Sequence, residues 1–293
     1  MSINERQNSK IGLDLLRAAQ VANLRVARIE SARMILSILL MLATVASMIH
    51  GSQSNHLLAI IGSSWAIIST LILVPSSRQL RNEACLLQEQ FDTYVFDIPW
   101  NRSQGSKINM ERIHELSYRF KGKVETIVDW YPHTDAPWPL NALICQRANI
   151  SYDIRLRERW RRIVVGFLTV WLSTGIAVGA ITSMTVWSIL STWFAPSCAA
   201  IIFGYEIVLS QARALYDRRL ILPGIDRAIE TLREENRENT LGSYEFLCRT
   251  FQDALFDARK RASRVPSWFY RILRERNEQI MRIAAVDAYN SDT

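Results

Sequence analysis

The chain has 293 residues, of which 49% are hydrophobic and 22% charged, and its formal net charge at pH 7 is +7. These averages hide an uneven distribution of charge along the chain. Charged residues are absent from some long stretches and concentrated in others. That pattern excludes an ordinary soluble domain of uniform composition and favours an all-α membrane protein with polar segments outside the bilayer.

The first predicted element is an amphipathic helix over residues 9–33, in which apolar side chains recur every three or four positions and Ser9 is the N-cap. It leads into the first of four charge-poor runs, each near the roughly 17 to 25 residues that cross a bilayer. These runs cover residues 34–49, 57–74, 163–187 and 188–205. We read them as four transmembrane helices, and for the first run, the shortest, a buried soluble helix is the alternative.

The central polar segment, residues 76–162, begins with a predicted helix that ends before Pro99. A turn around Gly105, a helix over residues 109–130 and a proline-rich turn follow. A further helix over residues 140–162 is expected to enter the third apolar run.

The C-terminal polar segment, residues 211–293, is also predicted to be helical. Its helices are expected to reach about residue 219 and then to cover 225–238, 243–263 and 267–289, separated by Pro223 with Gly224, by Gly242 and by Pro266. The segments 1–33, 76–162 and 211–293 would form one helical domain, and residues 34–75 and 163–210 two transmembrane hairpins.

The distribution of basic residues predicts the topology. Six Lys and Arg precede residue 34, fourteen lie between residues 75 and 163, and fifteen follow residue 211. The short connections at residues 51–56 and 182–187 contain no charged residue. Under the positive-inside rule both termini and the central segment are cytosolic. Because the first 33 residues are polar, we expect no cleavable signal peptide, and the first span would act as an uncleaved anchor.

Small and hydroxyl residues recur at helical spacing in two spans. They are Gly62 and Ser69 in the second span and Gly166, Thr169, Ser173, Gly175 and Gly179 in the third. Small residues let helices approach closely. Two interpretations remain open: packing within one protomer, or contact with other subunits around an aqueous path.

Glu206 lies near the cytosolic end of the fourth span, where it either reaches the interface beside Arg213 or has a functional role. Pro196 is expected to kink the same helix. A chain of charged residues through the spans is absent from the sequence, which disfavours a proton-coupled transporter.

Catalytic and metal-binding patterns are also absent from the sequence. It has no phosphate-binding glycine loop, HExxH or GxSxG, and Asp92 with Asp97 reads as a helix-end arrangement rather than a catalytic pair. Its four cysteines have no close paired spacing and its histidines no ligand pattern. We expect no catalytic residues, no metal, no cofactor and no disulfide framework.

Several strings are more specific. FDTYVFDIPWN at 91–101, DWYP at 129–132, ICQRANISYDIRLRERW at 144–160 and Arg6-Gln-Asn near the start together resemble the SMODS-associated four-transmembrane effector family. The resemblance implies a bacterial antiphage (CBASS) effector of the inner membrane, whose functional partner is a cyclic-oligonucleotide synthase. Such an effector is expected to bind a cyclic di- or trinucleotide, to assemble as a homo-oligomer and to permeabilise the bilayer, which causes growth arrest or cell death. A polymeric nucleic acid is not an expected partner.

A cyclic oligonucleotide presents phosphates and flat bases, so its receptor needs cations and stacking surfaces. The central segment supplies these residue types at Trp100, Asn101, Arg102, Trp130, Tyr131, Gln146, Arg147 and Asn149. Two interpretations remain open for them, ligand contact and a structural role within the helical domain. For the basic run at residues 155–162 we favour attraction to anionic lipid.

Two other functional classes fit the sequence. One is a membrane-tethered scaffold or sensor that recruits a protein partner, and the other is a constitutive channel or toxin that needs no synthase. Nucleotide-dependent permeabilisation separates the effector from both.

Overall fold

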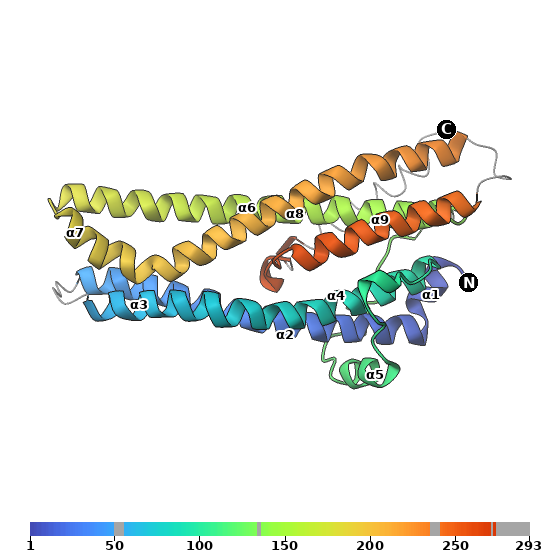
Figure 1. Ribbon diagram of the computed structural model, residues 1–293, viewed down its shortest axis with the longest axis horizontal. Helices are drawn as coiled ribbons and strands as arrows, with labels where there is room; N and C mark the ends of the chain where they lie inside the picture. The colour runs from blue at the N-terminus through green and yellow to red at the C-terminus, as the bar shows by residue number, and fades with distance from the viewer. Residues whose placement is uncertain (50–55, 134–135, 235–240, 271, 274–293) are drawn as a thin grey trace. The chain divides into compact units, whose positions relative to one another are not determined.

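The computed structural model describes residues 1–49, 56–133, 136–234, 241–270 and 272–273, and these contain helices and no strand (Figure 1). The predicted all-α fold is confirmed. Residues 51–55 of the connection predicted at 51–56 and most of the helix predicted over 267–289 lie outside the described residues.

Four long helical paths contain the candidate spans, which confirms that prediction. They are α2 (Lys10–Ile49); α3 (His56–Ile68) with α4 (Val74–Phe96); α6 (Leu140–Ile181); and α7 (Val186–Ile189) with α8 (Ala195–Glu234). A single π-helical turn joins each pair, at Ser69–Leu73 and Leu190–Phe194. A helix of 40 residues, the length of α2, measures about 60 Å, against about 30 Å of hydrocarbon. Each path is therefore long enough to cross a bilayer and to continue into a polar segment.

Two predicted boundaries were wrong. The helix predicted over residues 109–130 is the shorter α5 (Met110–Tyr118), followed by a 3₁₀ turn at Val124–Thr126. The chain leaves the helical path here and fully buries Ile127. Pro223 does not end a helix but lies inside α8. A proline removes one backbone hydrogen bond, and the burial of Ile225 and Ile229 on the same helix offsets that loss.

The chain divides into two compact units, which we call the polar unit and the apolar unit. The polar unit consists of Met1–Arg25, Leu80–Glu158 and the described part of Arg213–Thr293. The apolar unit consists of Val26–Gln79 and Arg159–Ala212. Three polar segments far apart in the sequence thus share one unit.

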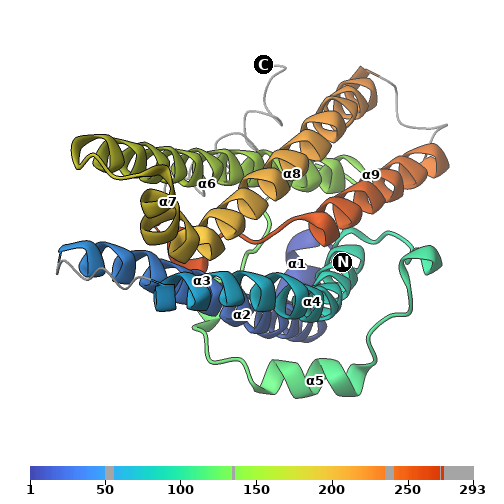
Figure 2. The ribbon, with the colours of Figure 1, turned by 60° about the vertical axis from the view of Figure 1, so that its left-hand side comes forward.

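The core of the polar unit combines side chains from α2, α4, α6, α8 and the last described long helix, α9 (Leu241–Arg261). Phe91, Phe96 and Leu143 are among its largest fully buried residues. Helix α5 lies against α2 and α4 (Figures 1 and 2), where the hydroxyl of Ser117 donates to Asp14 at 2.8 Å.

In the apolar unit, large hydrophobic side chains point outward. Exposed examples are Ile35, Leu39, Leu42, Ile60, Leu71, Phe167, Val170 and Ile176. Internally, the rings of Trp171 and Trp193 stack with centroids 4.5 Å apart. This inversion of the usual soluble pattern is what a hydrocarbon environment requires.

Candidate functional site

A short N-terminal helix, α1 (Ile3–Asn8), holds the corner that ends α4. The Arg6 guanidinium forms a two-pronged ion pair with Asp97, at 2.7 and 2.5 Å, and also donates to the Tyr94 carbonyl at 3.1 Å. Asp97 has a φ of 57°, a left-handed conformation that is uncommon for residues other than glycine. The bidentate pair fixes this corner of the FDTYVFDIPWN string.

Gln7 and Asn8, the two residues after Arg6, each make two hydrogen bonds to one residue of the DWYP string. The amide of Gln7 accepts from the Tyr131 backbone N–H at 2.8 Å and donates to its carbonyl at 3.4 Å. Asn8 donates to the Asp129 carboxylate at 2.8 Å and accepts from the Asp129 backbone N–H at 3.1 Å. Three motifs that are far apart in sequence therefore form one connected corner.

Beside this corner, the fully buried Asp92 carboxylate accepts four hydrogen bonds. They come from the Tyr131 hydroxyl at 2.6 Å, Arg259 at 2.5 Å, Gln252 at 3.0 Å and Gln88 at 2.9 Å. Asp92 thereby joins α4, α9 and the segment before α6, and its charge is balanced by Arg259.

Glu89, one turn earlier on α4, is also fully buried. It accepts from Arg249 at 2.5 Å and from Gln252 at 2.8 Å. The amide of Gln146 donates to Gln252 at 3.1 Å and to the Cys248 carbonyl at 3.0 Å, which brings α6 into the same network. We call Glu89, Asp92, Arg249, Gln252 and Arg259 the buried ionic network.

Burial governs the electrostatics of this network. It raises the pKa of Glu89, and the nearby Asp92 charge raises it further, although Arg249 acts in the opposite sense. Burial and then Asp92 raise the pKa of Tyr131 well above its ordinary value. Burial alone would lower the pKa of Arg259, but Asp92, Tyr131 and Glu89 together outweigh it and the net shift is upward. Arg259 therefore stays cationic and Tyr131 stays a neutral donor.

The loop after α4 is tied to the exposed edge of this network. The Asn101 amide donates to Asp253 at 2.9 Å and its oxygen accepts from the Ser103 N–H at 2.9 Å. The Trp100 indole donates to the Gly105 carbonyl at 3.0 Å. Arg102 follows on the surface.

The other predicted ligand-binding residues are dispersed. Tyr131 and Gln146 lie in the interior, and Trp130 packs against the core. Arg147 pairs with Asp226 of α8 at 2.5 Å, and Asn149 is half-buried. Of the predicted set, Trp100, Asn101 and Arg102 form a surface group, and a role for the set in ligand binding stays a prediction.

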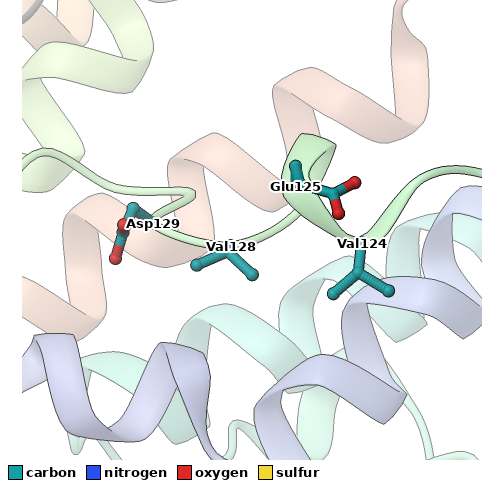
Figure 3. Close-up of a pocket in the computed structure, with 4 residues that line it drawn as sticks. All are labelled: Val124, Glu125, Val128 and Asp129. Atoms are coloured by element: carbon teal, nitrogen blue, oxygen red, sulfur yellow. The ribbon is translucent and has the colours of Figure 1, made fainter.

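A hollow of about 460 Å³ lies elsewhere on the polar unit. Figure 3 shows its lining, Val124, Glu125, Val128 and Asp129. Two carboxylates and two apolar side chains offer no cation to a phosphate. This hollow is therefore unsuited to a cyclic oligonucleotide.

A second buried ion cluster joins α6 to α8. The Asp153 carboxylate pairs with Arg157 at 2.7 Å and with the almost fully buried Arg218. Burial would raise the pKa of Asp153, but the two guanidinium groups outweigh it and lower the pKa to about 2. Burial is the main reason that the pKa of Arg218 falls to about 10.

This cluster predicts an acid-labile contribution to stability. The pKa of Asp153 is about 2 in the folded chain against an ordinary value of 3.8, so the contribution of about 2 kcal/mol is present above the ordinary pKa. It is lost as the pH falls through the folded value. We expect the melting temperature of the wild-type protein to exceed that of Asp153→Asn at pH 6, and the difference to shrink between pH 4 and pH 2. An equal difference at all pH values would contradict this assignment.

Some of the small residues in the spans pack within the chain. A Cβ on Gly62 would lie 2.4 Å from the Pro196 carbonyl oxygen, and one on Gly175 would lie 2.4 Å from the Trp193 indole nitrogen. Gly179 faces Ile189, and Ser69 is buried with its hydroxyl bonded to the Ala66 carbonyl. For these positions, packing within the protomer is the observed role.

The remaining positions of the third span face outward. Gly166, Thr169 and Ser173 are exposed, and a Cβ on Gly166 would meet no atom within 4 Å. Ala177 and Ala180, on the same side of α6, are exposed as well. We call these five residues the small-residue stripe. The described residues of the apolar unit therefore leave this stripe uncovered.

Glu206 has an ion-pair partner that the sequence did not indicate. Its carboxylate accepts from Arg33 at 3.0 Å, and the guanidinium also lies 4.8 Å from the centroid of the Phe203 ring. Arg33 is only 5% exposed. The pair joins α2 to α8 within the apolar unit.

The sequence did not identify α9 as part of the site. Arg249, Gln252, Asp253 and Arg259 lie in the C-terminal quarter, where the motifs that carry the resemblance are absent. One signal was present: Arg249, Gln252 and Arg259 recur at helical spacing beside the buried Cys248 and Leu255. Charged residues on a buried face require partners, which α4 supplies.

Comparison with known proteins agrees with the motifs and the fold. The family model described as the SMODS-associating 4TM effector domain matches residues 1–288. A protein of Bacillus cereus (strain VD146), named as a probable CBASS effector molecule, is 24% identical over 286 residues, which cover 94% of this chain and 95% of the relative. No solved structure matches the chain. Because the family model covers nearly the whole sequence, the chain belongs to the SMODS-associating 4TM effector family.

Proposed function

We propose that this protein is the membrane-permeabilising effector of a cyclic-oligonucleotide antiphage system. A cyclic di- or trinucleotide binds the polar unit on the cytosolic side of the bacterial inner membrane. Binding drives assembly of several copies, and the assembled spans make the membrane leaky. The match to the effector family over residues 1–288 is the observation that carries the proposal.

Three structural features support it. Four helical paths long enough to span a bilayer continue into polar segments, so one helix can contain both membrane and ligand-binding residues. The polar unit has a folded core of its own, as a ligand receptor requires. The small-residue stripe offers a face at which spans of neighbouring copies can approach closely.

The test is dye release from liposomes that contain the purified full-length chain. We expect release after addition of one member of a panel of cyclic di- and trinucleotides, and little release without it. The matched control is liposomes of the same lipid composition without protein. Release that is equally fast with and without every nucleotide would instead identify a constitutive channel. If no nucleotide binds the protein and none causes dye release, the membrane-tethered scaffold becomes the favoured function.

A further inference from the structure

The carboxylate of Asp253, on α9, is surrounded by donors from two elements. The Asn101 amide donates to one of its oxygens at 2.9 Å. The Gln104 amide and Arg249, the latter at 2.9 Å, donate to the other. We call Asn101, Gln104 and Arg249 the anion cradle. Two amides and a guanidinium can bind the two free oxygens of a phosphodiester as well as they bind the two oxygens of a carboxylate.

The residues around the anion cradle supply the other groups that a nucleotide site needs, an aromatic ring and further cations. The half-buried ring of Trp100 precedes Asn101, and the ammonium of Lys107 lies 5.8 Å from its centroid. Arg102 and Lys107 are exposed and make no ion pair with the residues that the structure describes. An aromatic surface beside exposed cations suits a stacked base and a second phosphate.

An unpartnered acceptor lies at the same place. The side-chain oxygen of Gln104 is buried, and within the described structure it has no hydrogen-bond donor. A buried acceptor without a donor costs free energy in the folded chain. The exocyclic amine of a nucleobase is a donor of the kind that this oxygen lacks.

We infer that the anion cradle is the phosphate site for the cyclic oligonucleotide, and that Asp253 occupies it as an internal substitute in the absence of ligand. The inference rests on the proposed function and names the site through which it acts. Asp253 is suited to displacement because its side chain is 32% exposed, whereas Glu89 is fully buried. When a phosphate replaces Asp253, Arg249 keeps its bonds to Glu89 and to the Pro99 carbonyl.

Displacement would also remove the contact that Asp253 makes between α9 and the loop after α4. Asn101 and Gln104 hold that loop to α9 through Asp253, and the same loop directly follows the helical path of the second span. A phosphate that takes over these donors keeps them satisfied and bridges Asn101 and Gln104 to Arg249 in place of Asp253. The cradle thus connects ligand binding to a change in the contacts of α9.

Binding of cyclic nucleotides to the full-length protein in detergent, measured by isothermal titration calorimetry, tests the inference. The probes are cyclic diadenylate, cyclic diguanylate, cyclic GMP–AMP and cyclic triadenylate. Asp253→Asn removes the competing charge, so we expect Kd for the bound nucleotide to fall about tenfold or more. Combined Asn101→Ala and Gln104→Ala should raise Kd by about tenfold.

Asp257→Asn is the matched control, because it removes the same charge from an exposed position one turn further along α9. It should leave Kd unchanged. Melting temperatures close to that of the wild type establish that the variants are folded, and if the double variant unfolds, Asp253→Asn alone decides.

The outcomes separate the two proposals. A wild-type Kd in Asp253→Asn would overturn the cradle while the effector function stands. Binding that appears only in Asp253→Asn would support an internal competitor. If neither the wild type nor Asp253→Asn binds any probe and no probe causes dye release, both proposals fail.

Discussion

Replacement of Asp92 by alanine is expected to destabilise the protein by about 3–5 kcal/mol, a large share of a typical folding free energy. The substitution leaves Arg259, whose side chain is only 17% exposed, without its anion and removes the acceptor of the Tyr131 hydroxyl and of a Gln252 amide proton. A buried charge without a partner is among the most destabilising defects in a folded chain. The measurement is the melting temperature of the detergent-purified protein, together with the protease sensitivity of α9.

Asp257→Ala is the matched control, because Asp257 is an exposed acidic residue on α9. Its melting temperature should stay close to that of the wild type. A double variant, Asp92→Asn with Arg259→Met, should recover part of the loss because it removes both charges together. Equal melting temperatures for Asp92→Ala and Asp257→Ala would show that the buried ionic network does not hold α9.

Bulk added to the small-residue stripe is expected to abolish nucleotide-dependent leakage without unfolding the chain. Gly166→Leu and Ser173→Leu together place large side chains on an exposed face, where a Cβ on Gly166 meets nothing within 4 Å. The protomer therefore tolerates them, whereas close approach of a second copy does not. Dye release should fall to the level without nucleotide, and chemical cross-linking should recover fewer oligomers.

The control pair is Val165→Phe with Leu172→Phe, which adds bulk to the same helix at exposed positions outside the stripe. It should leak like the wild type. Gly175→Leu is unsuitable for this purpose, since its side chain would meet Trp193 of the same chain. If the stripe variant leaks normally, the copies assemble through another surface.

Local sequence patterns were sufficient to predict those features that depend on a single segment of the chain. The four apolar runs, the N-cap at Ser9 and the end of α4 before Pro99 follow from hydropathy, hydrogen-bonding capacity and backbone geometry, and the structure agrees with each. The same patterns failed at Pro223, where burial on both sides kept the helix continuous. They failed again after Tyr118, where burial of Ile127 in the core outweighed helical periodicity.

The sequence by itself determined the helical class, the number of candidate spans and the family, because length, composition and short motifs are properties of single segments. Only the tertiary structure decided which residues meet. It joined Arg6 to Asp97, divided the small residues between an internal and an exposed face, and placed Asp253 among the donors of the cradle. The physical reason is that ion pairs and buried hydrogen bonds depend on the distance between atoms, and partners such as Asn101 and Asp253 are 152 positions apart in sequence.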